Sequence, residues 1–293
     1  MVDPADAAEP GGAPAPERLR EMFLRGVSGV RWLRIGTYVV ALLATLDFVL
    51  WLGQRGVYNA HYLLGITPIL LQGFVVTVEL VVVVIPLGFV VGFLVGWART
   101  SRHRLLAGFG GLYVDFFRSM PPLVLIAFVF LISLASLGSA RLNPYLVQNI
   151  ALWLGVVVLG LHSGAYQAEI VRAGILSVPA GQTEASDAIG LGRIRTLFLV
   201  VLPQAFRVSL PALGNEFSSV IKDTSLLNVI GWLEMSGIGL FQILPALHIS
   251  LFTPLLVWTE IGILYLVVTS ILNGVVRGVE NAFKVPGLEV AAS

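Results

Sequence analysis

The sequence predicts an all-α protein that is embedded in a membrane and crosses it six times. Hydrophobic residues make up 57% of the chain and charged residues only 12%, which excludes a water-soluble globule of 293 residues. Apolar runs long enough to cross a bilayer as helices recur along the chain, and arginines cluster in alternate connections between them. The predicted spans cover residues 35–53, 68–97, 113–137, 150–175, 197–221 and 251–276.

The first 34 residues precede these spans. They are rich in Ala, Pro and Gly and then basic, which predicts a disordered cytoplasmic tail that ends at the membrane surface. Residues 35–53 then form an additional N-terminal transmembrane helix, because a helix rises about 1.5 Å per residue. A secretory signal peptide does not fit, since this apolar stretch is too long and no small-residue cleavage site follows it.

The distribution of basic residues orients the spans. If the N-terminal tail lies inside, the basic clusters between spans also lie inside, and the outer loops hold only Arg55 and Arg141. Residues 277–293 then form a cytoplasmic C-terminal tail. The basic residues on the inner side are Arg99, Arg102, Arg104, Arg193, Arg195, Arg277 and Lys284.

Residues 226–246 are apolar but are interrupted by glycines and a proline, and they carry Glu234. We expect an outer re-entrant or interfacial helix here. A complete span would place Arg277 and Lys284 outside, against the charge rule.

The second span carries two further signals. Gly88, Gly92 and Gly96 recur every fourth residue, which predicts a stripe of bare backbone where a neighbouring helix approaches closely. Glu79 lies on the same span, and a carboxylate at membrane depth is expected to face a partner or a water-filled cavity.

The connection at residues 177–196 predicts a short cytoplasmic helix. Glu184 and Asp187 are expected in its first turns, where carboxylates complement the helix dipole, and Gly190 ends it. Ala185, Ser186 and Ala188 keep one flank low enough for the groove of another protein to close over it. The alternative is a surface helix that merely connects two spans.

The spacing in this connection resembles the EAA loop of ATP-binding-cassette (ABC) importer permeases. Ser186 replaces the second alanine of that pattern, whose other positions are occupied by Glu184, Ala185, Gly190, Val200, Leu202 and Pro203. The flanking segments resemble the polar amino acid uptake branch of these permeases over residues 65–276. They are residues 117–123 (FRSMPPL), 165–172 (AYQAEIVR), 202–205 (LPQA), 215–217 (NEF) and 222–226 (KDTSL).

The resemblance implies a five-helix ABC importer permease core at residues 65–276, to which the span at 35–53 is an addition. It implies a bacterial plasma (inner) membrane protein that pairs with a second permease subunit, identical or homologous, around a translocation path. Two ATPase subunits inside and an amino acid-binding protein outside would complete the importer. Coupling to the ATPases is implied for Glu184, Ala185, Ser186, Asp187 and Gly190.

A path for polar amino acids must carry charges that a bilayer rejects. Because a zwitterion presents a carboxylate and an ammonium group, we expect Arg118 to bind the first and Asp223 the second. Bonding between helices is the alternative role for both. Ser119 and Glu216 complete the expected substrate site, although Ser119 departs from the family pattern. Glu169 and Arg172, three residues apart, are expected to form an internal ion pair.

Several function classes are excluded. The chain has only two lysines, Lys222 and Lys284, and neither completes a phosphate-binding loop, so ATP is expected to be hydrolysed by a partner. No cysteine is present and the four histidines are isolated, so no metal site or cofactor is expected. The near-neutral charge speaks against a nucleic acid partner.

One other function class stays open. An ion-coupled secondary amino acid transporter would use Glu79 and Glu216 as proton or sodium sites. The sequence shows no matching pair of interrupted segments in its two halves, which counts against this alternative. The transported amino acid and the choice between a homodimer and a heterodimer also stay open.

Overall fold

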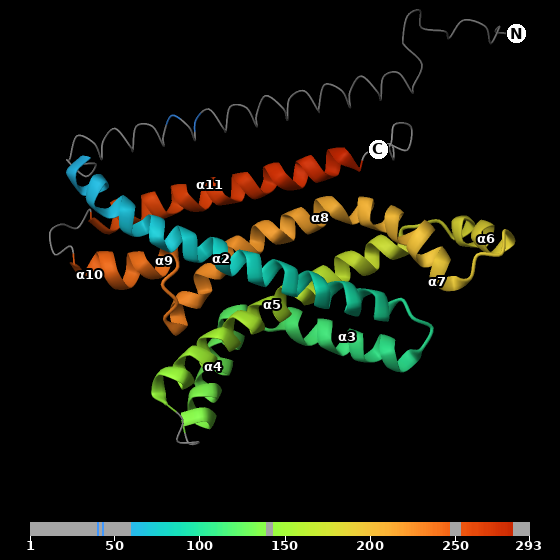
Figure 1. Cartoon of the computed structure of the whole chain (residues 1–293), viewed down its shortest axis with the longest axis horizontal. Helices are drawn as coiled ribbons and strands as arrows, with labels where there is room; N and C mark the ends of the chain where they lie inside the picture. The colour runs from blue at the N-terminus through green and yellow to red at the C-terminus, as the bar shows by residue number, and fades with distance from the viewer. Residues whose placement is uncertain (1–39, 41–42, 44–59, 139–142, 247–252, 284–293) are drawn as a thin grey trace, which may run out of the picture. The chain divides into compact units, whose positions relative to one another are not determined.

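The computed structural model describes residues 40, 43, 60–138, 143–246 and 253–283, and in this part every regular element is a helix (Figure 1). The tail at 1–34, all but two residues of the predicted span at 35–53, and residues 284–293 lie outside the described residues. The elements are α2 (Ala60–Arg99), α3 (Arg104–Ser119), α4 (Pro122–Gly138), α5 (Pro144–Leu176), α6 (Ala180–Ala188), α7 (Arg193–Thr196), η1 (Leu197–Val201), α8 (Leu202–Asp223), η2 (Thr224–Ile230), α9 (Met235–Ile238), η3 (Gly239–Ile243), α10 (Leu244–Ala246) and α11 (Thr253–Ala282).

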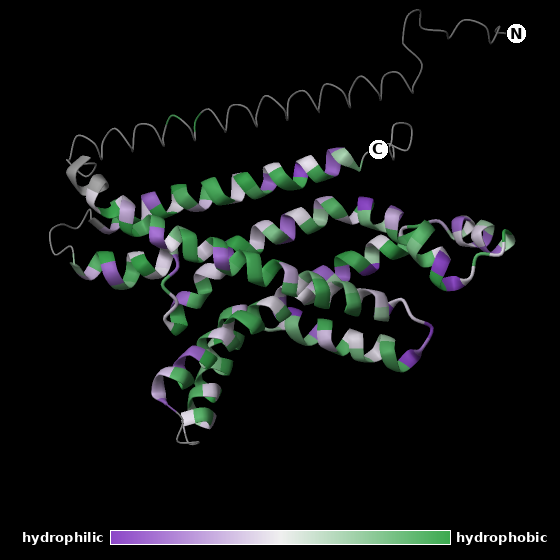
Figure 2. Ribbon diagram, viewed as in Figure 1, coloured by the Kyte–Doolittle hydropathy of each residue, from purple (hydrophilic) through white to green (hydrophobic). Residues whose placement is uncertain are grey.

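Within the described residues, four helical runs are long and apolar enough to cross a bilayer: Gly65–Arg99, Pro144–Leu176, Arg193–Ile230 and Pro254–Ala282. The pair α3 and α4 makes a fifth if it counts as one broken span. Figure 2 shows hydrophobic residues along these helices and hydrophilic residues around α6, α7 and the connection between α2 and α3. The described part therefore holds four to five spans, and the first predicted span, at residues 35–53, falls outside it.

The predicted span at residues 113–137 is not one straight helix. It is divided between α3 and α4, which meet at an angle of 100°. Met120 adopts an extended backbone conformation because it precedes Pro121, and a residue before proline is driven out of the α region. Pro121 and Pro122 lack the amide hydrogens that would continue the α3 ladder, so the helix restarts in a new direction.

The glycine stripe of α2 lies against α5. A methyl group added at Gly92 would lie 2.6 Å from the Cβ of Gln167 and 2.9 Å from the backbone oxygen of Gly164. At Gly96 it would lie 2.6 Å from the backbone oxygen of Ala168. Close approach of two helices, which the spacing predicts, is therefore confirmed.

The apolar core lies where α2, α4, α5, α8 and η2 meet. Its fully buried members include Val84, Ile126, Val156 and Leu227, which come from four different elements. Burying such aliphatic side chains among one another holds these elements together through dispersion contacts, since lipid tails are as apolar as the side chains themselves.

Residues 226–246 fold into short elements rather than a span. The longest apolar helical run, Met235–Ala246, reaches only about 18 Å at 1.5 Å per residue. Glu234 is fully buried and caps α9 by accepting hydrogen bonds from the amides of Ser236 (3.0 Å) and Gly237 (2.8 Å). The Tyr265 hydroxyl on α11 donates to the same carboxylate over 2.6 Å, which ties this segment to α11.

Candidate functional site

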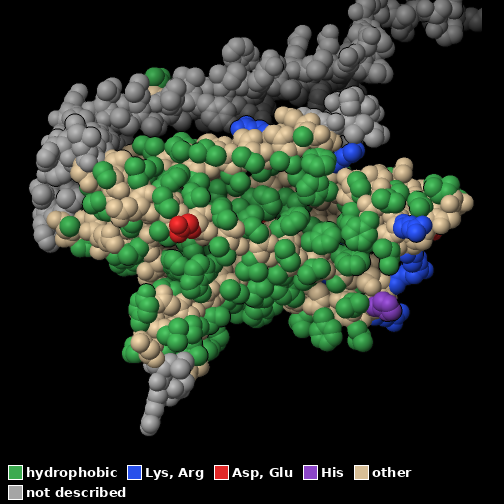
Figure 3. All heavy atoms as spheres, viewed as in Figure 1, with side chains coloured by type: hydrophobic (Ala, Val, Ile, Leu, Met, Phe, Trp, Pro, Cys, Tyr) green, Lys and Arg blue, Asp and Glu red, His purple; other side chains and the backbone are tan. Residues whose placement is uncertain are grey.

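A polar cavity of about 250 Å³ opens between α3, α5 and α8. Figure 3 shows that hydrophobic side chains dominate the visible face of the protein, and a polar cavity is unusual in such a setting. Its lining residues are Arg118, Tyr166, Glu169, Ile170, Ala212, Asn215, Glu216 and Ser219.

Arg118 supplies the cation of the cavity. It lies in the last turn of α3, next to the break that Pro121 causes. Its guanidinium carbon is 5.2 Å from the ring centroid of Tyr166, a cation–π contact that supports the flat face of the group. Within the described part of the chain it makes no ion pair, so the edge of its guanidinium is available to a carboxylate.

Glu216 supplies a carboxyl group to the cavity from α8. Its Oε1 accepts a hydrogen bond from the Ser163 hydroxyl over 2.7 Å. The Ser163 oxygen in turn accepts from the Gln167 amide nitrogen over 2.9 Å. Both partners come from α5, so the position of this carboxylate depends on how α5 and α8 pack.

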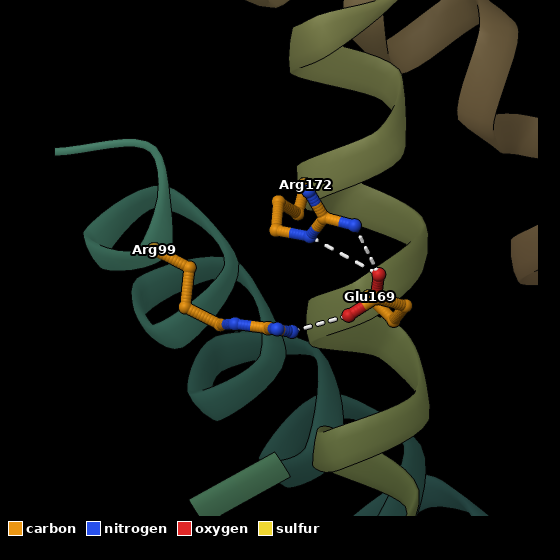
Figure 4. Close-up of polar contacts among 3 residues, drawn as sticks. All are labelled: Arg99, Glu169 and Arg172. Carbon is orange, nitrogen blue, oxygen red and sulfur yellow. Dashed lines mark hydrogen bonds and ion pairs between the residues drawn. The ribbon is translucent and has the colours of Figure 1, made fainter. Parts of the chain in front are cut away.

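The second carboxylate of the cavity, Glu169, is already paired with two arginines. Figure 4 shows it between Arg172 on the same helix and Arg99 at the end of α2. The predicted pair of Glu169 with Arg172 is confirmed, with Arg172 Nε donating over 3.1 Å. Sequence reasoning missed Arg99, which is 70 residues away, and no local pattern pointed to it.

The structure brings two of the four predicted substrate residues together. Arg118 and Glu216 line the same cavity, whereas Ser119 and Asp223 do not. Ser119 is exposed at the end of α3, and Asp223 lies at the end of α8, two helical turns beyond Glu216. Sequence reasoning did not select Tyr166, Asn215 and Ser219, although all three lie in or next to the segments that carried the resemblance.

A second polar groove of about 320 Å³ lies between α8 and α11, and Asn215 borders both spaces. The Ser218 hydroxyl joins the two helices there by donating to Asn273 Oδ1 over 2.7 Å. Arg277 and Glu280 lie at its α11 end. By contrast, a hollow between α2, α5 and α8 is lined by side chains such as Phe89, Phe93 and Leu213 and suits only apolar atoms.

The short helix predicted at residues 177–196 is α6. It ends in a Schellman-type turn, in which the Leu191 amide bonds to the Ser186 oxygen over 3.0 Å and Gly190 adopts a positive φ of 79°. The expected placement of Glu184 and Asp187 is wrong: α6 begins at Ala180, so its first turn holds no acidic residue. Asp187 lies in the last turn, where the helix dipole does not favour a carboxylate.

The exposed surface of α6 includes Glu184, Ala185 and Asp187. Ser186 is buried, and its hydroxyl bonds to the Gln182 oxygen over 2.7 Å, so it faces its own chain rather than a partner. Two apolar side chains that sequence reasoning did not select, Ile189 and Ile194, are 78% and 73% exposed beside it. Such residues are typical of a surface that another protein covers.

The amino-acid sequence of the chain matches a family of known proteins. Residues 85–285 match the family described as binding-protein-dependent transport system inner membrane component. The glutamine transport system permease protein GlnP of Escherichia coli (strain K12) is 32% identical over 74% of this chain and 94% of its own length. The L-cystine transport system permease protein TcyB of Bacillus subtilis (strain 168) is 40% identical over 56% of this chain and 66% of its own length.

Solved structures agree with these sequence relatives. An amino acid ABC transporter crystallised with histidines has a chain that superimposes with a TM-score of 0.63 at 25% identity, covering 77% of this chain and 99% of its own. The inward-facing MetNI methionine ABC transporter gives a TM-score of 0.60 at 19% identity over 75% of this chain and 99% of its own, a likeness of fold.

Proposed function

The chain belongs to the family of binding-protein-dependent transport system inner membrane components, and we propose that it is the permease subunit of an ATP-driven importer of polar amino acids. It is a multi-pass inner membrane protein, and its relatives are transport subunits rather than enzymes. The observation that supports the substrate class is the cavity between α3, α5 and α8, which is lined both by Arg118, without an ion pair among the described residues, and by the Glu216 carboxyl group.

In this cavity Arg118 binds the carboxylate of the amino acid and Glu216 its ammonium group. The planar fork of arginine suits a carboxylate, and hydrogen bonds between charged groups are stronger than those between neutral ones. Ser119 and Asp223 lie one residue and two turns beyond these groups along α3 and α8. We place them on the outer side of the cavity, where they meet the substrate before it reaches Arg118 and Glu216.

Basic residues orient the permease. The connection between α2 and α3 and the region of α6 and α7 carry the Arg and His side chains at one end of the view in Figure 3. The positive-inside rule makes this end cytoplasmic, together with both termini, and leaves the outer end for an amino acid-binding protein.

The open polar face of α8 and α11 supports a dimer. Asn215, Asn273 and Arg277 border this face, and lipid does not solvate such groups. A second permease subunit, identical or homologous, that turns the same face toward it would enclose a polar path between the two chains.

Two ATPase subunits then bind the α6 helices of the two permeases. Glu184, Ala185 and Asp187 are exposed for this contact, with Ile189 and Ile194 as apolar anchors, while Ser186 and the turn at Gly190 hold the shape of the segment from behind. Nucleotide-dependent closure of the ATPases shifts the permease between states only if they hold α6 differently in each state.

Uptake into proteoliposomes that contain the whole importer tests the cavity. R118A and E216Q are each expected to lower uptake at least tenfold, since each removes one charge partner of the zwitterion, while the complex still assembles. Arg102→Ala, an exposed arginine in the connection between α2 and α3, is the matched control and should transport normally. Normal uptake by both cavity variants would contradict the proposed substrate site.

A charge reversal on α6 tests the coupling surface. Glu184→Arg should leave the permease folded but separate ATP hydrolysis from uptake, because a reversed charge opposes the groove that holds α6. Co-purification with the ATPases and hydrolysis per transported molecule are the measurements. If both match the unmodified importer, α6 is not the docking element.

A further inference from the structure

The two carboxylates of the polar cavity differ in how their oxygens are used. Both oxygens of Glu169 are occupied, Oε1 by Arg172 and Oε2 by Arg99. Glu216 has a partner for Oε1 only, and no described residue donates to its Oε2. Glu216 is therefore the carboxylate with an oxygen left for a ligand.

The partner of Glu216 is held by a second donor. Ser163 has one hydroxyl hydrogen, which it gives to Glu216 Oε1 over 2.7 Å. The Ser163 oxygen in turn accepts a hydrogen bond from the Gln167 amide over 2.9 Å, which holds the hydroxyl in place. Both hydrogen bonds of this relay are donated in the direction of Glu216, an arrangement that favours the ionised form of its carboxyl group.

The relay lies behind the cavity and not in it. Gln167 is fully buried and Ser163 is 1% exposed, and neither lines the cavity. The two side chains are one turn apart on α5, and Gln167 lies against the glycine stripe of α2. A methyl group added at Gly88 would lie 2.6 Å from the Gln167 amide nitrogen, so the glycine leaves the room that this amide occupies.

We propose that Gln167 and Ser163 are positioning residues that keep Glu216 ionised, with Oε2 toward the cavity, and so make the cavity select ligands that carry an ammonium group. This inference rests on the proposed function, in which Glu216 receives the ammonium group of the substrate. It adds that selection depends on two residues that never touch the ligand.

A pair of ligands that differ only in the ammonium group separates positioning from general damage. The purified permease–ATPase complex, without binding protein, is titrated with L-glutamine and with glutaramate, which is glutamine without its α-amino group. S163A should weaken glutamine binding about tenfold, the effect of removing a hydrogen bond to a charged group. Q167M removes the donor behind Ser163 and should weaken glutamine binding in the same direction, and both variants should leave glutaramate binding unchanged. Ser163→Thr, which keeps the hydroxyl, should restore the preference for glutamine.

Two further variants complete the test. In a complex that already carries E216Q, adding S163A should change neither affinity, because the group that Ser163 positions is gone. Ser133→Ala is the matched control, since Ser133 is another buried serine whose hydroxyl bonds within its helix, to the Val129 oxygen over 2.6 Å. It should leave the ratio of the two affinities unchanged.

The outcomes distinguish the inference from the function beneath it. If S163A and Q167M weaken both ligands equally, or neither, the positioning role is overturned while the cavity keeps its function. If glutamine, L-cystine and L-arginine all bind without any dependence on Arg118 and Glu216, or do not bind at all, the proposed substrate site falls and the inference falls with it.

Discussion

The exposed side of α2 and the exposed side of α8 have opposite chemistry, although both helices cross the membrane. On α2 the outward stripe includes Leu71, Val75, Val82, Val90 and Leu94, each between 45% and 64% exposed. On α8 the outward stripe runs through Pro211, Ala212 and Asn215, with Glu216 and Ser219 beside it, and it borders both polar spaces. The exposed fraction of a side chain therefore does not tell whether it contacts lipid or water. The stripe on α2 suits lipid, and the stripe on α8 requires water or a polar partner.

The inward sides of the two helices differ in a matching way. α2 meets α5 through glycines, so backbone approaches backbone. α8 meets α11 through the hydrogen bond from Ser218 to Asn273. We call these two helix contacts the α2–α5 seam and the α8–α11 seam. The close backbone contact of the α2–α5 seam leaves little freedom to move. The α8–α11 seam ends in an open polar groove, which suits a helix that lines a path.

The largest effect is expected from placing a charge on the lipid stripe. Val90→Arg sets an arginine about 13.5 Å along the helix from Arg99, near mid-membrane, which costs about 2.5–3.5 kcal/mol of insertion free energy. Asn215→Arg places the same charge on the polar stripe of α8 and should insert normally. The amount of each variant in isolated membranes measures the difference, and equal loss of both would show that the two stripes face the same medium.

A smaller effect is expected at the two seams. Gly92→Ala adds a methyl group 2.9 Å from a backbone oxygen that cannot move, and we expect a loss of about 1–3 kcal/mol of stability. Gly214→Ala meets a methyl of Val276 at 2.6 Å, and that side chain can turn away, so its loss should be less than half as large. Apparent melting temperatures in detergent compare the two, and a greater loss at Gly214 would contradict the contrast between the seams.

Removal of the hydrogen bond between α8 and α11 should matter less. Ser218→Ala is expected to lower stability by about 0.6 kcal/mol, the average for hydrogen bonds between membrane helices, because Asn273 borders the polar groove and can bond to water instead. Unfolding by increasing amounts of SDS gives this free energy. A loss above about 1.7 kcal/mol would mean that the groove is dry in the folded protein.

The smallest effect is expected at the one acidic residue of the α2 stripe. Glu79 is exposed and lies 20 residues from Arg99, which is about 30 Å along the helix. Because this distance matches the thickness of the hydrocarbon core, Glu79 lies at the outer interface when Arg99 lies at the inner one. Glu79→Gln should leave uptake within twofold of normal. Loss of uptake, together with sensitivity to ionophores, would favour an ion-coupled transporter.

Much of this architecture follows from local sequence rules. Apolar runs and the basic residues beside them are properties of consecutive residues, and so the helices at 60–99, 144–176 and 253–282 were predictable. The glycine stripe and the pair of Glu169 with Arg172 depend on spacings of three or four residues, which a helix converts directly into one face. The end of α6 at Gly190 required only a residue that tolerates a positive φ.

The tertiary structure alone decided which groups share the cavity. Glu216 and Asp223 are seven residues apart and lie on the same side of α8, so their sequence positions do not say which of them is at the depth of Arg118. Arg99 reaches Glu169 because α2 packs along α5, and the 100° angle between α3 and α4 depends on what each helix packs against. The helical repeat decides which residues share one face of a helix, and this can be read from the sequence. The depth of a side chain in the membrane and its partner on another helix are set by contacts between helices, so only the tertiary structure determined the site.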